Sequence, residues 1–276
     1  MFIRGSVKLN GLKTAGGKLR AFVKRNKKNV AAGIMLLLLA GIAYAAPRAV
    51  VDVANNAAAS AKELPIYCVD RDDKVVALTF DAAWGNEDTQ KILDILEKHN
   101  VKVTFFATGG WVETYPDDVK KIIEAGHAFG NHSENHKFMT RLTDEQKKQE
   151  LMKVHDKVQA LTGYEMCLFR PPYGDYNDAV VKVADSIGYY TIQWSVDSLD
   201  WKDYGVDSIV RTVTQHKSLD SGAIILMHNG AKYTADALDS IITNLEEQGY
   251  SFVTVAELIH TGKYHMDHTG KQIADE

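Results

Sequence analysis

Two histidines four residues apart, His132 and His136, are candidates for binding a metal ion. Side chains at this spacing share one face of a helical turn, and two neutral imidazoles on one face can bind one cation. The residue after His132 is Ser133, whereas zinc proteases with this histidine spacing carry a glutamate there. The pattern therefore excludes that class of protease and leaves two interpretations open, a metal site or a pair of hydrogen-bonded histidines.

A single carboxylate, Asp81, follows the apolar run 75–80. The run has the length and composition of a short buried strand. Open α/β folds and barrels keep their chemistry at the carboxyl ends of such strands, so Asp81 is predicted to lie in the functional site. The next residue, Ala82, has a side chain that can neither bind a metal nor move a proton.

The segment Arg170-Pro171-Pro172-Tyr173-Gly174 directly follows another apolar run. Two prolines fix their φ angles and remove two backbone donors, so the first free N–H after them belongs to Tyr173. A stiff loop with one N–H held in place suits an oxyanion hole. The alternative interpretation is a rigid turn that only ends a strand.

Two more strand ends carry groups that can move protons. Asp197 and Asp200 follow one predicted strand, with Trp201 beside them, and His228 follows the apolar run 223–227. A histidine with a carboxylate near enough to hold its proton can act as a general acid. Taken singly, each of these residues could instead have a structural role, as a helix cap or a hydrogen-bonded histidine.

Alternating strands and helices must position these residues. The hydrophobic pattern predicts strands over 75–80, 102–107, 166–170, 189–196, 223–227 and 251–254. It predicts helices over 88–99, 116–125, 143–162, 178–187, 207–215 and 235–248, with a loop over 126–137. Residues Thr143 to Gln146 resemble a capping box at the start of one helix. The alternation indicates an α/β fold of parallel units, a complete or irregular (β/α) barrel.

Charge is distributed unevenly along the 276 residues. The formal net charge is −4, but residues 1–29 contain nine Lys or Arg and no acidic residue. The remainder therefore carries −13. Beside an uncharged apolar segment, this basic leader is better explained by membrane topology than by nucleic-acid binding, so no nucleic-acid partner is expected.

These patterns predict the organisation of the chain. We expect a basic cytoplasmic leader over 1–29, a signal anchor or signal peptide over 30–47, a linker over 48–63, a catalytic domain over 64–260 and a frayed polar tail over 261–276. A retained anchor would give a single-pass membrane protein with its catalytic domain outside. Cleavage would give a secreted protein.

The chain has two cysteines, Cys68 and Cys167. Such a small number fits an exported protein that does not depend on a disulfide framework. One disulfide or two separate buried thiols are both compatible with the sequence.

The order and register of these motifs resemble the polysaccharide deacetylases with a NodB homology domain, carbohydrate esterase family 4. The resemblance runs from about Lys74 to Ile259. Its motifs are Thr79-Phe-Asp-Ala82, His132-Ser-Glu-Asn-His136, Arg170-Pro-Pro-Tyr-Gly174, Asp197-Ser-Leu-Asp-Trp201 and Leu226-Met-His228. It implies an irregular (β/α) barrel that removes acetyl groups from N-acetylated sugars with the help of one divalent metal ion, often zinc.

The resemblance also implies roles for single residues. Asp81 corresponds to the catalytic base, and Arg170 to the residue that holds the carboxylate of the base. His132 and His136 correspond to the metal ligands.

Further roles follow from the later motifs. Tyr173 corresponds to the oxyanion donor and contacts the substrate. His228 corresponds to the catalytic acid, with Asp197 favoured over Asp200 as its partner, and Trp201 to a residue that lines the sugar groove.

The sequence departs from the family pattern at Ala82, where a second aspartate commonly binds the metal. Water, substrate oxygens or a nearby acid such as Glu134, Glu87 or Asp88 are candidates to replace that ligand. The variant Asp-Ala-Ala-Trp-Gly resembles a branch of the family that is linked to sporulation.

Three functions remain after these observations. The first is a membrane-tethered N-deacetylase acting on peptidoglycan or a related N-acetylglucosamine polymer. The second is a glycan-binding or structural cell-wall protein that has lost metal binding, and the third is an esterase of the O-acetyl xylan type. The chain has no phosphate-binding glycine-rich loop, dinucleotide fingerprint or serine nucleophile elbow.

Overall fold

The computed structural model describes Lys24 and residues 62–275. Apart from Lys24, the predicted leader lies outside these residues, as do the apolar segment 30–47 and most of the linker. In the part of the chain that is described, no helix combines the length and the apolar character needed to cross a membrane.

Short strands alternate with helices along residues 62–275. The strands are β1 (Cys68–Val69), β2 (Val75–Ala82), β3 (Thr104–Ala107), β4 (Ala128–Asn131), β5 (Leu168–Phe169), β6 (Tyr190–Thr191), β7 (Val196–Asp197), β8 (Ala223–Asn229), β9 (Ser251–Phe252), β10 (Tyr264–Met266) and β11 (Lys271–Ala274). The α-helices are α3 (Thr89–Lys98), α4 (Gly109–Thr114), α5 (Pro116–Glu124), α6 (Asp144–Thr162), α7 (Asp178–Asp185), α8 (Val206–Thr214), α9 (Thr234–Glu247) and α10 (Val255–Leu258). Three 3₁₀ turns are η1 (Met139–Arg141), η2 (Pro172–Gly174) and η3 (Asp200–Lys202).

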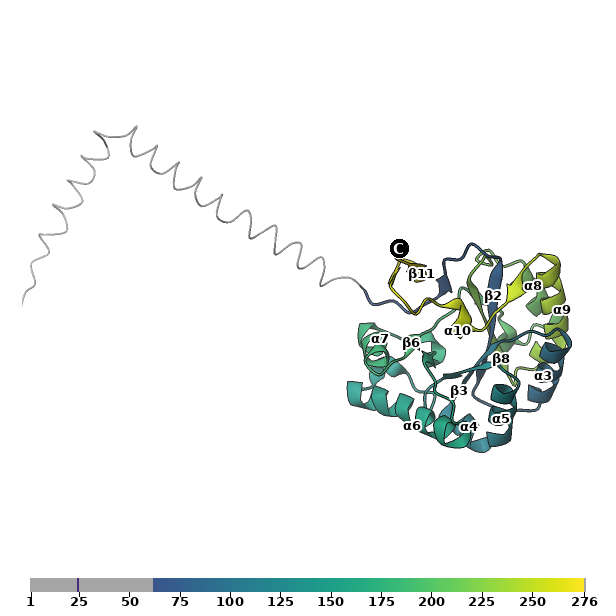
Figure 1. Ribbon diagram of the computed structural model, residues 1–276, viewed down its shortest axis with the longest axis horizontal. Coiled ribbons are helices and arrows are strands. Elements are labelled where there is room, and N and C mark those ends of the chain that lie inside the picture. Colours follow the sequence, from purple (N-terminus) through teal and green to yellow (C-terminus); the bar gives the residue numbers. More distant parts are fainter. Residues whose placement is uncertain (1–23, 25–61, 276) are drawn as a thin grey trace, which may run out of the picture. The chain divides into compact units, whose positions relative to one another are not determined.

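One sheet curls into a half-barrel, and the larger helices surround it (Figure 1). The strand order is β10-β11-β1-β8-β2-β3-β4-β5-β6, with β7 beside β8 and β9 beside β2. Strands β8, β2, β3, β4, β5 and β6 are parallel. A bridge between Ile66 and Ile192 brings the region before β1 next to the end of β6. The predicted α/β fold is therefore confirmed, as an incomplete barrel.

The alternation of side chains along β2 separates two layers of the core. Val76, Leu78 and Phe80 belong to the larger hydrophobic cluster, which includes residues of the surrounding helices. Val75 and Ala77 belong to a second cluster. Successive side chains of a strand point to opposite faces, so Asp81 shares the face of the second cluster.

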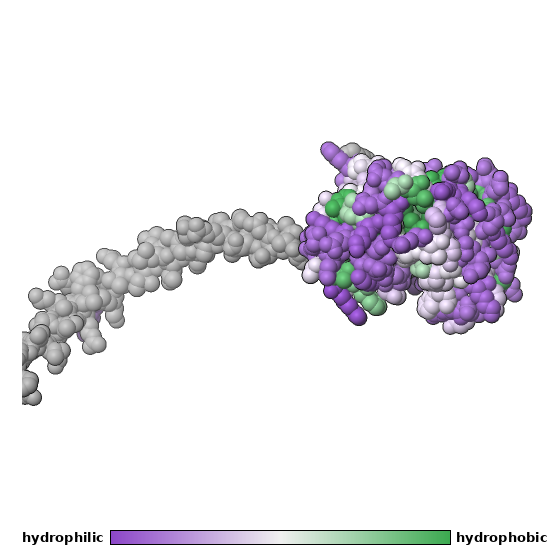
Figure 2. Space-filling model, turned by 90° about the horizontal axis from the view of Figure 1, so that it is seen from below, coloured by the Kyte–Doolittle hydropathy of each residue, from purple (hydrophilic) through white to green (hydrophobic). Residues whose placement is uncertain are grey.

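From outside, one face of the domain is mainly hydrophilic with small hydrophobic patches (Figure 2).

The start of α6 confirms the predicted capping box. Thr143 Oγ1 accepts a hydrogen bond from the backbone N–H of Gln146, and Gln146 Oε1 accepts one from the N–H of Thr143. These bonds satisfy backbone donors that a helix start leaves free.

Two predicted segments differ from the structure, and one helix was not predicted. The predicted loop 126–137 contains β4, a strand of only four residues with no polar alternation because both of its faces are buried. The predicted strand 189–196 is split into β6 and β7, which pair with different neighbours. The helix α4 was not predicted, because it has only six residues.

The polar tail 261–276 is ordered rather than frayed as far as residue 275. Strands β10 and β11 pair antiparallel, and β11 pairs in parallel with β1. The side chain of Gln272 is fully buried and donates a hydrogen bond to the His260 carbonyl. Hydrogen bonding to the sheet edge, which the polar composition does not indicate, orders this segment.

Neither cysteine is in a disulfide. Cys68 is partly buried in β1, and Cys167 is exposed just before β5. Both thiols are free, and neither fits the prediction of a fully buried side chain.

Candidate active site

A cavity of about 450 Å³ lies at the carboxyl ends of the parallel strands. It gathers most of the residues that the motifs single out, from five separate segments of the chain. Its lining includes Asp81, His132, His136, Tyr173, Asp197, Trp201 and His228, and also Trp84, Gly174, Trp194 and Leu226. The prediction that chemistry gathers at the strand ends is therefore confirmed in its geometry.

Asp81 and His228 occupy neighbouring strands. The ladder between β2 and β8 runs in parallel register from Val76 to Ala82, and it places Asp81 directly opposite His228. A carboxylate and an imidazole on adjacent strand ends can serve as a base and an acid for one substrate.

Asp81 is held by a buried arginine. Its Oδ1 accepts a hydrogen bond of 2.8 Å from Arg170 Nη1, which also donates to Thr79 Oγ1 at 2.8 Å. Burial alone raises the pKa of Asp81, but the positive charge of Arg170 and the hydrogen bond that it donates contribute to outweighing burial and hold that pKa below its usual value. Asp81 is therefore ionised at neutral pH.

Arg170 itself does not line the cavity, because it is fully buried beneath it. Its Nη2 donates to the Gln193 carbonyl at 3.1 Å, and its guanidinium lies 4.2 Å from the centre of the Phe106 ring. The arginine therefore acts on Asp81 from the interior of the barrel, as the predicted holding role requires.

The two histidines are brought together by a turn, not by a helix. Ser133 and His136 both have positive φ angles, 64° and 51°. The Asn131 side chain accepts a hydrogen bond from the Ser133 N–H and stabilises this turn. The rings of His132 and His136 lie 4.9 Å apart, so the predicted pairing is correct although the predicted helical geometry is wrong.

The His132 ring is oriented for a ligand. Its Nδ1 lies 2.8 Å from the Arg170 carbonyl oxygen, which can only accept, so Nδ1 donates and the lone pair is on Nε2. Burial lowers the pKa of His132 to about 4, and burial also lowers the pKa of His136. Both imidazoles are neutral at pH 7, as metal ligands must be.

The third ligand is not supplied by the acids that the sequence suggested. Glu134 forms an ion pair of 2.7 Å with Lys157, Asp88 accepts a hydrogen bond from the Gly230 N–H, and neither of them nor Glu87 lines the cavity. Over residues 62–275, no group of three or more His, Cys, Asp or Glu is arranged to hold a metal. The two neutral imidazoles fit a cation whose other positions are filled by water or substrate oxygens.

Tyr173 occupies a strained turn at the cavity edge. Its φ is 60°, in the left-handed region, and the N–H groups of the next two residues donate to the Pro171 and Pro172 carbonyls. The Tyr173 N–H has no backbone acceptor within the described residues. This geometry agrees with a donor held ready for an oxyanion.

His228 is paired with Asp200 rather than with Asp197, so the favoured prediction is wrong. Asp200 Oδ1 lies 2.7 Å from His228 Nδ1, and its Oδ2 accepts from the His228 N–H at 2.7 Å and from Thr234 Oγ1 at 2.6 Å. Asp197 instead accepts a hydrogen bond from the Leu199 N–H. The positive φ of Leu199, 56°, turns the chain so that Asp200 is fully buried under His228.

This pairing determines the protonation of His228. Burial lowers the pKa of the imidazole, but the hydrogen bond and the charge of Asp200 outweigh burial and raise that pKa above its usual value. The proton on Nδ1 is fixed by Asp200, which leaves Nε2 free to act on a ligand.

We predict that Asp200→Asn lowers the pKa of His228 by about 1 to 3, because it removes a buried charge in direct contact with the imidazole. An acid must be protonated, so activity is lost as pH rises through this pKa, and the loss will move to lower pH. NMR titration of His228 measures the change. Asp197→Asn is the matched control and should have a smaller effect, and a larger effect there would contradict the assignment of Asp200.

Exposed aromatic side chains surround the cavity. In the described part of the chain, the large hydrophobic residues that are exposed are Trp84, Phe138, Tyr173, Trp201 and Tyr204. Three of them line the cavity, Phe138 stacks on Tyr173 at 4.4 Å, and Lys202 lies over the rings of both Trp201 and Tyr204. Exposed aromatic rings around a cleft are typical of a ligand-binding surface.

Trp84 was not selected from the sequence. It lines the cavity and its ring stacks on His228, with centroids 5.7 Å apart. The signal in the sequence was its place three residues after Asp81, within the turn that follows β2.

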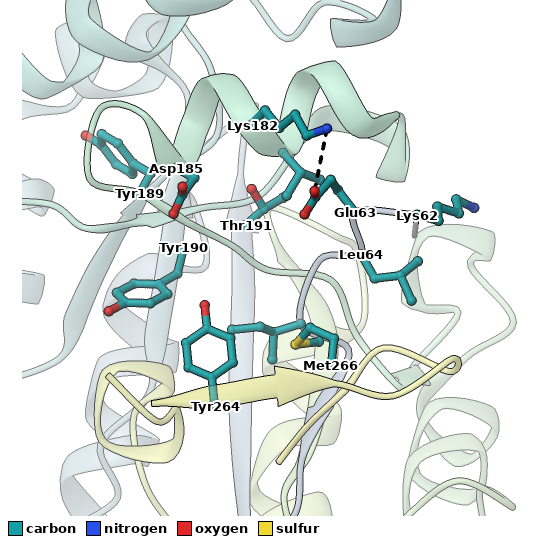
Figure 3. A pocket seen from close by; sticks show the side chains of 12 residues that line it. Lys62, Glu63, Leu64, Lys182, Asp185, Tyr189, Tyr190, Thr191, Tyr264 and Met266 are labelled. Carbon is teal, nitrogen blue, oxygen red and sulfur yellow. Dashed lines mark ion pairs between the residues drawn. The ribbon is translucent and has the colours of Figure 1, made fainter. Parts of the chain in front are cut away.

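A second cavity, of about 490 Å³, is lined by residues of β6 and β10, the two terminal strands of the sheet (Figure 3). Tyr190 and Tyr264 face each other across it, and Lys182 and Glu63 form an ion pair of 3.5 Å at its wall. It contains none of the residues that the motifs single out, so the cavity with Asp81 and His228 is the candidate active site.

Comparisons with known proteins identify the family of this chain. The sequence model of the family described as polysaccharide deacetylase matches residues 69–192. The peptidoglycan-N-acetylmuramic acid deacetylase PdaA of Bacillus subtilis is 37% identical over 70% of this chain and 74% of its own length. The peptidoglycan-N-acetylglucosamine deacetylase PgdA of Listeria monocytogenes is 39% identical over 73% of this chain and 43% of its own length.

Solved structures agree as well. BA3943 from Bacillus anthracis, described as a CE4 family pseudoenzyme, superposes with a TM-score of 0.68 at 39% identity, over 75% of this chain and 69% of that one. A mutant of BA3943, described as having restored enzymatic activity, superposes equally well at 40% identity, over 75% and 72% of the two chains. On its motifs, its fold and these relatives, the chain belongs to the polysaccharide deacetylase family, carbohydrate esterase family 4.

Proposed function

We propose that this chain is a metal-dependent deacetylase that hydrolyses acetamide groups of N-acetylated sugars in peptidoglycan or a related glycan. The observation that carries the proposal is the convergence of two oriented proton carriers in one cavity. Asp81 is held by Arg170 and His228 by Asp200, and His132 and His136 lie beside them. Peptidoglycan deacetylases among the relatives support this substrate class.

The residues divide the reaction into two proton transfers. Asp81, ionised beside Arg170, accepts a proton from the water that attacks the acetamide carbon. The N–H of Tyr173 donates to the oxygen on which negative charge develops. His228 then gives its Nε2 proton to the leaving amine, so the C–N bond breaks to give a neutral amine and acetic acid. The acetic acid ionises to acetate in solution, Asp81 loses its proton to solvent and His228 takes one up, which restores the starting state.

A divalent cation fits at His132 and His136, which line the same cavity with their rings 4.9 Å apart. When bound, it supplies Lewis-acid polarisation of the carbonyl and lowers the pKa of water. His132 is fixed for this role by the hydrogen bond to the Arg170 carbonyl. Because Ala82 supplies no carboxylate, the affinity for the cation is expected to be lower than that of a site with three protein ligands.

The rim of the cavity suits a sugar. Tyr173 and Trp201 are 61% and 52% exposed, although each carries a large apolar ring. Aromatic faces of this kind pack against the apolar faces of sugar rings. We therefore assign Tyr173 and Trp201 to substrate binding.

The test combines metal titration with acetate release from N-acetylglucosamine oligomers and purified cell wall, using the full chain. We predict that the wild-type chain binds zinc and releases acetate. His132→Ala should weaken zinc binding at least about tenfold, because it removes one of two protein ligands, and should abolish acetate release. His127→Ala is the matched control, since His127 is also buried but lies outside the cavity.

A second candidate function is glycan binding without catalysis. Ala82 in place of a ligand favours it, and BA3943 is a related protein described as a pseudoenzyme. Ala82→Asp separates the two functions. If the wild-type chain binds no divalent metal and releases no acetate, whereas Ala82→Asp does both, the enzyme proposal fails and the binding function replaces it.

We further propose that the domain acts outside the cytoplasm, tethered by the apolar segment 30–47 or secreted after cleavage. The basic residues before that segment support this orientation. Fractionation of cells that express the full chain, followed by protease accessibility, tests it.

A further inference from the structure

Trp84 covers one face of the His228 imidazole. The two rings are nearly parallel, with an interplanar angle of 22° and centroids 5.7 Å apart. The His228 side chain is 13% exposed, whereas Trp84 is 46% exposed. The indole therefore lies between the imidazole and solvent, and half of its own surface remains in contact with water.

The turn that carries Trp84 is fixed from behind. Trp111 Nε1 donates a hydrogen bond of 2.7 Å to the Gly85 carbonyl. Gly230, with a φ of 89°, lets the turn approach closely, because a Cβ there would lie 2.5 Å from the Trp84 carbonyl oxygen. Asp88 holds the N–H of Gly230 at 2.8 Å. These contacts join the Trp84 turn to the end of β8, two residues after His228.

Packing in the hydrophobic core does not explain why this turn is fixed, because Trp84 is exposed and is not part of the core. Leaving half of an indole in water forgoes part of the free energy that its burial would provide. The contact with His228 gives the exposed ring a role. An aromatic face attracts a cation, and tryptophan does so most strongly.

We propose that Trp84 is a positioning residue for His228, whose indole face holds the protonated imidazole against Asp200 and leaves Nε2 open to the cavity. Asp200 fixes the ring through Nδ1, in the plane of the imidazole. Trp84 fixes it from the perpendicular direction. Together the two contacts restrict both the tilt and the rotation of the ring.

The charged groups around His228 decide the direction of the expected effect. Asp200 contacts the imidazole, Asp81 lies opposite on β2, Asp197 lies on β7, and His136 lies across the cavity. The carboxylates favour the imidazolium and would remain after a change at Trp84. Loss of the aromatic face therefore removes one favourable interaction with the cation without replacing the others, and the pKa of His228 should fall.

The experiment is an NMR titration of the full chain with labelled histidine, in the presence of a chelator. His228→Gln identifies the resonance among the ten histidines. We expect Trp84→Leu, which keeps apolar cover but lacks a π face, to lower the pKa of His228 by about 0.4 to 1. Trp84→Phe should lower it less, because phenylalanine retains a weaker aromatic face.

Trp201→Leu is the matched control, because Trp201 lines the same cavity but makes no stacking contact with His228 among the described residues. It should leave the pKa of His228 within about 0.2 of the wild-type value, a margin set by half of the smallest shift expected from cation–π loss. An unchanged or raised pKa in Trp84→Leu overturns the proposal. If Trp84→Leu does not fold, an unchanged pKa in Trp84→Phe overturns it equally.

Activity provides a second readout that rests on the proposed function. The loss of kcat/KM at high pH should move to lower pH in Trp84→Leu, by the same amount as the pKa of His228. A titration shift without any acetate release from the wild-type chain would support the role of Trp84 and contradict the deacetylase proposal. The two failures are therefore distinguishable.

Discussion

Asp81→Asn is expected to reduce kcat for acetate release by about 10² to 10⁴, the range that general base catalysis contributes. Asparagine keeps the shape of the side chain and can still accept a hydrogen bond from Arg170, but it cannot take a proton from water. The domain should remain folded, and circular dichroism checks this. Acetate release from N-acetylglucosamine oligomers measures the loss.

The pH dependence gives an independent check of Asp81. Arg170 holds the pKa of Asp81 below its usual value, so in the wild-type chain the activity that needs the ionised carboxylate is lost only as pH falls through this low pKa. Asp203→Asn is the control, because Asp203 is exposed and lies outside the cavity lining. Retention of wild-type kcat in Asp81→Asn would exclude Asp81 as the base.

Arg170→Ala is expected to lower the free energy of unfolding by about 3 to 5 kcal/mol, the usual loss when one partner of a buried ion pair is removed. Two effects contribute. Asp81 is left buried without its counter-charge, and the space beneath the cavity, between Phe106 and the strand ends, is emptied. Urea denaturation of the full chain measures the loss. Arg141→Ala, at an exposed arginine that lies over the Phe138 ring, should lower stability by no more than about 1 kcal/mol.

A double-mutant cycle separates the two contributions. Arg170→Ala combined with Asp81→Ala removes both charges, so the double variant should be less destabilised than the sum of the single variants. Strict additivity would show that the two side chains do not interact. That result would contradict the 2.8 Å contact between Arg170 and Asp81.

The sequence was sufficient to locate the elements that carry Asp81 and His228. Strands β2 and β8 are long and mostly apolar, and each carries its site residue, Asp81 or His228, at the penultimate position. Apolar runs of this length, eight and seven residues, can be recognised as buried strands without an alignment. Because parallel strands end at one edge of a sheet, the gathering of the site residues followed from the fold class.

The partner of His228 could not be predicted in the same way. Asp197 and Asp200 are only three residues apart, and the choice between them depends on the left-handed conformation of Leu199. A leucine gives no signal for positive φ, since its side chain disfavours that region. The turn at His132 has the same difficulty, because Ser133 and His136 both adopt positive φ without a glycine.

Short elements were the other gap. Strand β5 lies within the predicted strand 166–170, but β6 and β7 have two residues each, too few to show that 189–196 contains two strands. The pair β10 and β11 is polar in sequence and is ordered by its pairing with β1 at the edge of the sheet. Such segments are determined by tertiary contacts, which a local pattern does not record.

Asp81 and His228 are paired through the backbone of neighbouring strands, so the residues that move protons lie on different elements from the aromatic side chains that contact the glycan. Their spacing is set by the hydrogen bonds of the β2–β8 ladder, a rigid part of the sheet. The exposed side chains of Tyr173 and Trp201 instead lie on turns beyond the strand ends. Sequence changes in those turns can alter which glycan is accepted while the distance between the proton carriers stays constant. The scaffold thus offers a route by which new substrate preferences can be engineered, or can evolve, without rebuilding the reaction centre.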